Sequence, residues 1–183
     1  MKVGFVTIGQ SPRADVTHTI KEMLGSKVKL IEKGALDGLS KEEIARLAPT
    51  ARDYVLVTRT KNGTPVKVAR RHVFPRIQKC IEELEEMDVD LILLLCTGEF
   101  PKIKAKKLLI TPDRLISSIV LEILKRGKLG IVVPEKEQIP QLKQKWKNKN
   151  VSLSITTANP YGKNKAFEEA ANFLAKENVD LII

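Results

Sequence analysis

The sequence predicts an α/β protein built on parallel sheets and arranged as two pseudo-symmetric α/β halves. Short runs of β-branched and aliphatic residues alternate with helix-length amphipathic segments along almost the whole chain, which is typical of βαβ units. Several of these runs are apolar throughout, as in strands that helices cover on both faces. An internal repeat favours the two halves, because Val-Asp-Leu-Ile occurs at 89–92 and again at 179–182, and Gly-Phe-Val at 4–6 resembles Gly-Ile-Val at 130–132.

The first half begins with a strand over residues 2–8, which are β-rich and apolar. Gly9 breaks this strand, and Ser11 followed by Pro12 predicts the N-cap and first position of a helix. A second strand is expected at 28–31. The helix between the two strands should bury an apolar stripe made of Val16, Ile20, Met23 and Leu24.

Residues 34–69 are expected to form an insertion with one helix and one β-hairpin. Ser40 and Glu43 make a capping-box pattern that opens the short helix. An Asn-Gly pair separates the β-rich runs 54–58 and 65–69, and such a pair is the strongest short signal of a hairpin.

A long helix and an apolar strand complete the first half, which we place at residues 1–110. Residues 90–95 are almost wholly apolar, so they should form a central strand. A short strand or loop is expected at 108–110. The long helix should bury one stripe over about four turns, formed by Val73, Ile77, Ile81 and Leu84.

The second half, residues 111–183, continues the alternation. Thr111 and Pro112 begin a helix, and another helix is expected over 135–148. The predicted strands are 129–133, 151–155 and 179–183. The apolar stripes of the first and last helices are Leu115, Ile119, Ile123 and Leu124, and Ala166, Ala170, Phe173 and Leu174. If the halves are equivalent, the last strand continues past Ile183 with a site residue of its own, so we expect part of the natural chain to be missing.

Composition excludes several classes of protein. A chain of 183 residues buries enough surface to fold without disulfides or a structural metal. No apolar run approaches the ~20 residues of a membrane span, and no signal-peptide pattern is present, so the cytoplasm is the expected location. The formal net charge of +10 permits nucleic-acid binding. However, the one Trp, two Tyr and five Phe do not interleave with the basic runs, so we expect a solvated Lys/Glu surface and no nucleic-acid partner.

The candidate site lies where loops follow the carboxyl ends of parallel strands. Four loops qualify, at 9–13, 96–100, 134–135 and 158–161, and three of them precede helix N-termini that favour anions. In the first, Gly9 allows close backbone approach and Arg13 can hold a carboxylate or phosphate through two hydrogen bonds. Asp15 falls in the first helical turn, where it is either a site residue or a surface acid that complements the helix dipole.

Cys96 is the strongest single candidate for a catalytic residue, because it ends the predicted central strand beside Thr97 and Gly98. Nearby N–H groups and cations would lower its pKa from about 8.5 and make it reactive. The alternative is an inert buried cysteine. Cys80 lies next to the apolar stripe of the long helix and is expected in the core. Neither a metal-ligand cluster nor a nucleotide-binding glycine pattern is present.

The chain resembles the AroM-like proteins along essentially its whole length. The matching stretches are 8–13 (Ile-Gly-Gln-Ser-Pro-Arg), 34–40 (Gly-Ala-Leu-Asp-Gly-Leu-Ser), 54–59 (Tyr-Val-Leu-Val-Thr-Arg), 94–101 (Leu-Leu-Cys-Thr-Gly-Glu-Phe-Pro), 130–134 (Gly-Ile-Val-Val-Pro) and Lys145-Trp146. That family is in turn similar to the aspartate/glutamate/hydantoin racemase superfamily. The resemblance implies two α/β halves that each supply a cysteine at a strand end, the second of them past Ile183.

The resemblance also implies a cofactor-independent racemase or isomerase that acts on a small anionic metabolite, a carboxylate. Cys96 would then be an acid/base with Thr97 beside it. The ligand would be held by Gly9, Gln10, Ser11, Pro12, Arg13 and Asp15, with help from Gly98 and Asn159. The alternative is a non-catalytic metabolite-binding or regulatory protein that uses the same cleft. A homodimer is the candidate assembly, and no metal, nucleic acid or membrane is expected.

Overall fold

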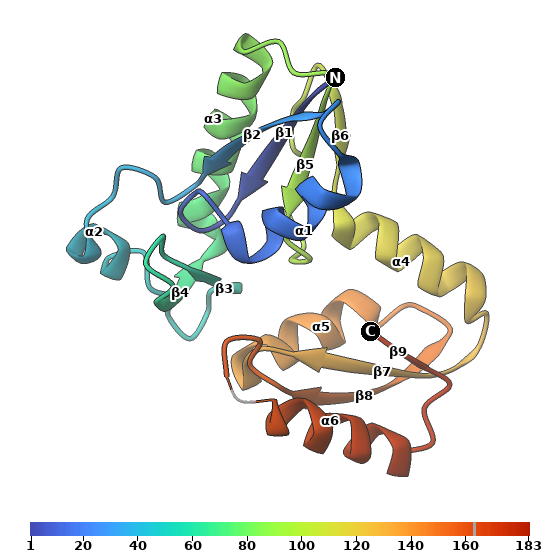
Figure 1. Cartoon of the computed structure of the whole chain (residues 1–183). Coiled ribbons are helices and arrows are strands. Elements are labelled where there is room, and N and C mark those ends of the chain that lie inside the picture. The colour runs from blue at the N-terminus through green and yellow to red at the C-terminus, as the bar shows by residue number, and fades with distance from the viewer. Residues whose placement is uncertain (163) are drawn as a thin grey trace. The chain divides into compact units, whose positions relative to one another are not determined.

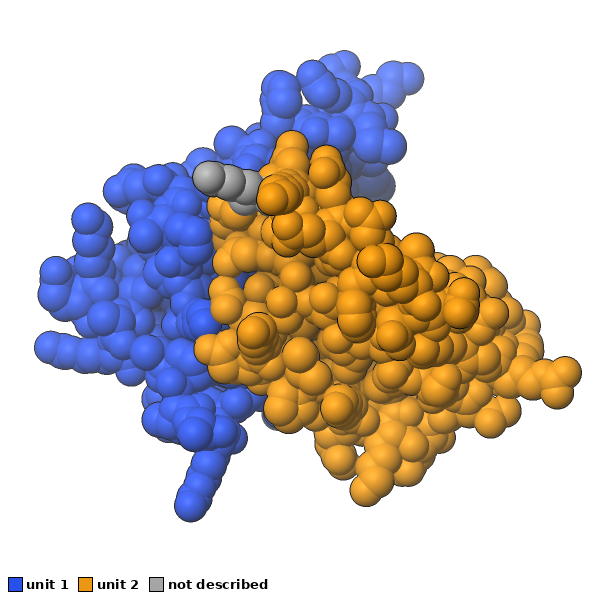
Figure 2. All heavy atoms as spheres, turned by 90° about the horizontal axis from the view of Figure 1, so that it is seen from below, with its two compact units in different colours: residues 1–115 blue, residues 116–183 orange. Residues whose placement is uncertain are grey.

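A computed structural model describes residues 1–162 and 164–183 of the chain. It divides them into two compact units, Met1–Leu115 and Ile116–Ile183, which Figure 2 draws in different colours. Each unit contains its own parallel sheet (Figure 1). Among the described residues, every helix falls short of the length and apolar character that crossing a membrane requires.

The first sheet has the strand order β2-β1-β5-β6, and all of its strands are parallel. Its members are β1 (Lys2–Thr7), β2 (Lys29–Gly34), β5 (Leu91–Leu95) and β6 (Leu108–Ile110). The apolar strand predicted at 90–95 is therefore central, between β1 and β6. The parallel α/β class predicted from the alternating pattern is confirmed.

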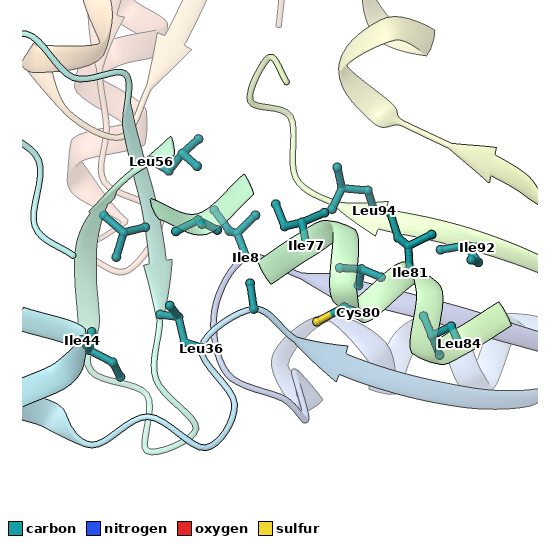
Figure 3. Close-up of a cluster of buried hydrophobic side chains, with 14 of the residues drawn as sticks. Ile8, Leu36, Ile44, Leu56, Ile77, Cys80, Ile81, Leu84, Ile92 and Leu94 are labelled. Atoms are coloured by element: carbon teal, nitrogen blue, oxygen red, sulfur yellow. The ribbon is translucent and has the colours of Figure 1, made fainter. Parts of the chain in front are cut away.

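Helix α3 (Arg70–Glu86) packs on β1 and β2 and supplies much of the first core. Figure 3 shows Ile77, Cys80, Ile81 and Leu84 of this helix in one cluster with strand residues such as Ile92. The buried stripe predicted from the spacing is confirmed. Cys80 belongs to this core, as expected, and burial raises the pKa of its thiol to about 11.

The insertion contains helix α2 (Lys41–Ala45) and a two-stranded antiparallel sheet of β3 (Val55–Arg59) and β4 (Pro65–Ala69). The capping box at α2 is present, since Ser40 Oγ accepts from the Glu43 N–H at 3.2 Å and Glu43 Oε2 accepts from the Ser40 N–H at 2.7 Å. The antiparallel pairing of β3 with β4 confirms the predicted hairpin.

Helix α1 (Ala14–Leu24) departs from its prediction. Its expected apolar stripe is largely at the surface, with Val16, Met23 and Leu24 exposed. The buried residue is Thr17, whose hydroxyl donates to the Arg13 carbonyl and lies 3.0 Å from Glu32 Oε1. The backbone of Arg13 and the hydroxyl of Thr17 contact Glu32 and so connect the start of this helix to β2.

The second unit has the strand order β8-β7-β9, again all parallel. Its strands are β7 (Gly127–Val133), β8 (Val151–Thr157) and β9 (Leu181–Ile182), and its helices include α5 (Ile139–Trp146), which follows a 3-10 turn η1 (Lys136–Gln138), and α6 (Lys165–Lys176). In α6, Ala170 and Leu174 are buried as predicted, whereas Phe173 is exposed.

Helix α4 (Pro112–Ile123) begins in the first unit, and its later residues belong to the second. Its predicted stripe is wrong at three of four positions, because Leu115, Ile119 and Ile123 are exposed and Leu124 alone of the four is buried. The face that packs into the second core carries Val120 and the following Leu124. The apolar residues of α4 cover two faces of the helix, so their spacing alone could not select the buried one.

The repeated segments occupy equivalent places in the two sheets. Gly4 of β1 pairs with Ile92 of β5, and Gly130 of β7 pairs with Ile182 of β9. The order β2-β1-β5 thus corresponds to β8-β7-β9, strand for strand along the chain.

The aspartate of each repeat also makes the same contacts. Oδ2 of Asp90 accepts the Lys2 N–H at 2.6 Å, and Oδ2 of Asp180 accepts the Lys128 N–H at 2.7 Å. The residue two positions earlier has a positive φ in both cases, 52° at Asp88 and 51° at Asn178. In each unit, the repeated segment therefore begins the strand that pairs with the unit's first strand, with the same positive φ and the same aspartate hydrogen bond.

Candidate functional site

Three loops meet at one edge of the first sheet, since its strands are parallel and their carboxyl ends coincide. Residues 8–13 follow β1, residues 35–40 follow β2 and residues 96–100 follow β5. All of the predicted site residues except Asn159 lie in or beside the first and third of these loops.

Arg13 is held rigidly at this edge. The residue is only 9% exposed, and its guanidinium forms a two-bond pair with Asp15, with Nε to Oδ1 and Nη2 to Oδ2 both at 2.8 Å. Its Nη1 also donates to Thr7 Oγ1 at 3.4 Å. The backbone N–H of Arg13 donates to Glu32 Oε2 at 2.8 Å, which fixes the start of α1 against β2.

A second guanidinium reaches the same carboxylate. Nη1 of Arg59, at the end of β3, donates to Oδ2 of Asp15 at 3.2 Å. The Arg59 side chain is 29% exposed, compared with 10% for Arg13, so Arg59 is the more accessible of the two. No local pattern in the sequence predicts this contact, because 44 residues separate Arg59 from Asp15. Two guanidiniums therefore share the Asp15 carboxylate at this edge of the sheet.

These contacts hold the pKa of Asp15 at about 2, with the hydrogen bonds from Arg13 as the largest cause. A carboxyl whose pKa is lowered by folding stabilises the protein above its unfolded pKa, and this contribution is lost as the pH falls toward the folded value. We therefore expect the free energy of unfolding to fall between pH 4 and pH 2 by about 1 kcal/mol more in the wild type than in Asp15→Asn, a figure reduced for solvent screening. Urea unfolding at a series of pH values measures this difference, and identical pH profiles would contradict it.

Ser11 is not the N-cap of α1, which corrects its prediction. The helix begins at Ala14, and its N-cap residue Arg13 makes no side-chain capping bond. Ser11 instead donates twice to Asp37 in the loop after β2, from its N–H to Oδ1 at 2.7 Å and from Oγ to Oδ2 at 2.6 Å. Asp37 Oδ2 also accepts the Gly34 N–H at 2.7 Å. One carboxylate therefore ties the loop after β1 to the end of β2.

The side chain of Gln10 is used inside the protein as well. Its amide nitrogen donates to the carbonyls of Leu36 and Leu39, both at 3.2 Å, and its amide oxygen accepts the Lys61 N–H at 3.0 Å. Gln10 is buried, so it links the first loop to the second loop and to the hairpin turn. These bonds favour a positioning role for Gln10.

Gly9 allows another group to approach its backbone closely, and the group that does so is the end of strand β3 in the hairpin. A Cβ at Gly9 would lie 2.3 Å from the Arg59 carbonyl oxygen and 2.4 Å from Thr58 Oγ1. The hairpin therefore lies directly on the first loop. Pro12, after a cis peptide bond, is the exposed residue of this loop.

Cys96 ends β5 as predicted, but its thiol is not activated. Burial raises its pKa to about 11, and nearby Asp113 acts in the same direction. The Gly98 N–H, which donates to Sγ at 3.3 Å, and the charge of Arg13 oppose this shift without cancelling it. The expectation of a lowered pKa is corrected, because desolvation outweighs the helping groups. Thr97, the next residue, is exposed.

The hairpin and α3 also hold the third loop. The Tyr54 hydroxyl accepts the Glu99 N–H at 3.0 Å, and Nη1 of Arg70 donates to the Glu99 carbonyl at 2.7 Å. The guanidinium of Arg70 lies 4.0 Å from the centre of the Tyr54 ring. The insertion thus contacts the loops on both sides of the sheet edge, a role that its local sequence signals did not reveal.

Asn159 lies in the second unit, at the carboxyl end of β8. Its amide nitrogen donates to Glu135 Oε1 at 3.0 Å, and its oxygen accepts the Tyr161 N–H at 2.9 Å. Asn159 therefore joins the loops after β7 and β8. In residues 1–162 and 164–183, no group of three or more potential metal ligands comes together.

Comparison with known proteins gives one family. No curated protein matches the sequence. Among solved structures, the chain is similar to a periplasmic solute-binding protein of an ABC transporter from Actinobacillus succinogenes 130z, solved with bound D-allose. The identity is 9% and the TM-score 0.32, over 99% of this chain and 68% of that one. The family model described as AroM protein matches residues 3–183. The chain belongs to the AroM family.

Proposed function

We propose that the carboxyl edge of the first sheet binds a small carboxylate. The observation that carries this proposal is the convergence of Arg13 and Arg59 on Asp15, where two guanidiniums face one carboxylate. These two guanidiniums lie at the carboxyl ends of the strands, where open parallel sheets bind their ligands. Guanidinium groups suit a carboxylate because their N–H donors match its two oxygens.

Asp15 indicates how the ligand binds. A ligand carboxylate competes with Asp15 for Nη1 of Arg59, whose 3.2 Å bond to Asp15 is longer than the two bonds from Arg13. Nε of Arg59 donates to the Gly63 carbonyl at 3.1 Å, which keeps the side chain at the hairpin. Arg13 then stays paired and keeps the loop in shape, while Arg59 turns to the ligand. The exposed hydroxyl of Thr97 and the N–H groups of the loop after β5 are the further polar groups near Cys96.

Arg59→Gln tests this proposal. We expect the variant to bind small carboxylates at least ten-fold more weakly than the wild type, because a charged hydrogen bond is worth about 1.5–3 kcal/mol. Ligand-dependent thermal shifts with a panel of 2-hydroxy, 2-oxo and 2-amino acids give the apparent affinities. Arg52→Gln, which removes the same charge at an exposed loop position, is the matched control. Equal loss in both variants would show a general charge effect and contradict the site.

A second candidate function, proton transfer of the racemase or isomerase type, is favoured by the position of Cys96. With a thiol pKa of about 11, Cys96 is protonated near neutral pH, which suits a proton donor and not a base at rest. The C–H bond beside the carboxylate first breaks as hydroxide removes its proton and leaves a carbanion. Cys96 then donates its S–H proton to that carbon, which forms the new C–H bond, and the thiolate takes a proton from water and so restores the thiol and the hydroxide.

Incubation of the protein with 2-amino and 2-hydroxy acids in deuterated water tests this second function. We expect deuterium at the carbon beside the carboxylate, and loss of at least nine-tenths of the rate in Cys96→Ala. The binding-only alternative predicts no incorporation, with ligand-dependent thermal shifts that survive Cys96→Ser. Incorporation that persists in Cys96→Ala would exclude Cys96 as the donor.

A further inference from the structure

We propose that Tyr54 and Arg70 are positioning residues for Cys96, because together they fix the loop that covers its thiol. This inference deepens the second candidate function, on which it rests for the role of Cys96. Its test needs no ligand, so the inference and that function can fail separately. The contacts that carry it lie wholly within the first unit.

The loop after β5 turns back over the thiol directly after the strand. The N–H of Gly98 donates to Sγ of Cys96 at 3.3 Å, so the loop backbone covers one side of the sulfur. A Cβ at Gly98 would lie 2.7 Å from Cδ2 of Leu56 and 3.3 Å from the same sulfur. The loop therefore passes between strand β3 and the thiol, with no room for a side chain at Gly98.

One residue later, the rest of the unit holds both polar backbone groups of Glu99. Its N–H donates to the Tyr54 hydroxyl at 3.0 Å, and its carbonyl accepts from Nη1 of Arg70 at 2.7 Å. The second of these bonds has a charged donor and belongs to the stronger kind. The Arg70 guanidinium lies 4.0 Å from the centre of the Tyr54 ring, a distance at which a cation and an aromatic face attract each other. The two side chains therefore anchor the loop as a pair, next to Gly98.

The anchoring pair is itself fixed by the first core. Tyr54 and Cys96 pack against the same cluster of buried side chains. Tyr54 directly precedes β3 and Arg70 is the first residue of α3, and the Arg70 N–H donates to the Tyr54 carbonyl at 3.0 Å. Thr97 and Glu99, by contrast, are exposed. The loop over the thiol therefore depends on Tyr54 and Arg70 for its position.

The environment of the thiol determines the effect of releasing this loop. Burial is the largest cause of the raised pKa of Cys96, and the hydrogen bond from the Gly98 N–H opposes it as a smaller cause. Release of the loop removes both, and hydration of the sulfur favours the thiolate. The ionisable groups that act on the thiol or hold its loop are Arg13, Tyr54, Arg70, Glu99 and Asp113. We therefore expect the pKa of Cys96 to fall toward its ordinary value when the anchor is removed.

Alkylation by iodoacetamide over a series of pH values tests this inference on the whole chain, with each cysteine followed by mass spectrometry of its own peptide. Tyr54→Phe removes the acceptor of the Glu99 N–H and keeps the ring, and Arg70→Gln removes the charged donor. We expect each variant to lower the pH midpoint of Cys96 alkylation by about one unit. Below the midpoint the reaction should then be about ten-fold faster, because one pKa unit is a ten-fold change in the thiolate population.

Cys80 is the internal control, because it is buried in the same core on α3 and its pKa is also raised to about 11. Its alkylation should be the same in the variants as in the wild type. Arg52→Gln, which removes a charge at an exposed loop position, is the matched variant and should change neither cysteine. Faster alkylation of both cysteines in Tyr54→Phe and Arg70→Gln would show general opening of the core and contradict a positioning role.

The outcomes separate this inference from the proton-transfer function. If Cys96 reacts at the wild-type rate in both variants at every pH, the pair does not hold the loop and the inference is wrong, whatever the protein binds. If Cys96 alone reacts faster in the variants, the positioning role is supported. That result holds even where the wild type incorporates no deuterium into any 2-amino or 2-hydroxy acid, in which case only the proton-transfer function is wrong.

Discussion

Replacing Gly9 by alanine is expected to lower the free energy of unfolding by about 3 kcal/mol, at the upper end of the cost of overpacking a core. The added Cβ would lie 2.3 Å from the Arg59 carbonyl oxygen and 2.4 Å from Thr58 Oγ1, and real Cβ atoms do not approach other atoms so closely. The Arg59 carbonyl cannot retreat without breaking its bond from the Gln10 N–H, which is 3.2 Å long. The hairpin as a whole must therefore move away from the loop after β1.

Urea unfolding of Gly9→Ala and Gly25→Ala measures this effect against a suitable control. Gly25 has a φ of 69° and no atom within 4 Å of its would-be Cβ. Its substitution costs only the conformational strain of a positive φ, about 1 kcal/mol. Equal costs at the two positions would mean that the hairpin is not held against the loop. The Gly9 variant should also lose affinity for carboxylates, because Arg59 moves with the hairpin.

The fold was predictable where the signal is local. The stripe of α3 repeats at helical spacing, the hairpin is marked by an Asn-Gly pair, and α2 begins with a capping box. Each of these depends on residues a few positions apart, so the sequence alone carries it. The apolar strand at Leu91–Leu95 was placed in the centre of the sheet for the same reason.

The site was predictable only in part, because its geometry depends on distant partners. Open parallel sheets bind ligands at the carboxyl ends of their strands, which identified the loops after β1 and β5 as the candidate site. Arg13 and Cys96 were therefore expected at one edge of the sheet. This rule could not show that Ser11 bonds Asp37, 26 residues away, in place of capping α1. It also could not show that desolvation would govern the Cys96 thiol, since burial depends on the packing of the whole loop.

Most of the contacts that the sequence could not predict come from the insertion, residues 34–69. The local sequence of the hairpin gives no sign of contacts with the site. In the structure, however, Arg59 of β3 donates to Asp15, and Tyr54, just before β3, accepts the Glu99 N–H in the loop after β5. In the second unit, which has the equivalent strand order, the described residues between β8 and α6 contain no such hairpin. The difference between the repeated units thus lies at the very edge where we place the ligand.

Asp37→Ala is the second change for which we expect a large effect. Its carboxylate accepts three hydrogen bonds, from the Ser11 N–H, the Ser11 hydroxyl and the Gly34 N–H, all between 2.6 and 2.7 Å. Gly34 is buried, so its N–H would lose its acceptor without gaining water. Leaving a buried donor unpaired costs about 1–3 kcal/mol, and we expect a total loss of about 3–4 kcal/mol in the free energy of unfolding.

A double-mutant cycle with Ser11→Ala shows whether this loss comes from the Ser11–Asp37 hydrogen bonds that connect the loop after β1 to the loop after β2. Ser11→Ala alone removes one of the three bonds and should cost about 1 kcal/mol. Asp37→Ala should then cost about 1 kcal/mol less in the Ser11→Ala background than in the wild type, because the two residues share that bond. Glu122→Ala, which removes an exposed carboxylate in α4, is the control and should leave the urea midpoint unchanged. Additive effects of Ser11→Ala and Asp37→Ala would mean that the two side chains do not interact, and the loop that carries Arg13 would then be held by its other bonds, such as those of Gln10 to Leu36 and of Arg13 to Glu32.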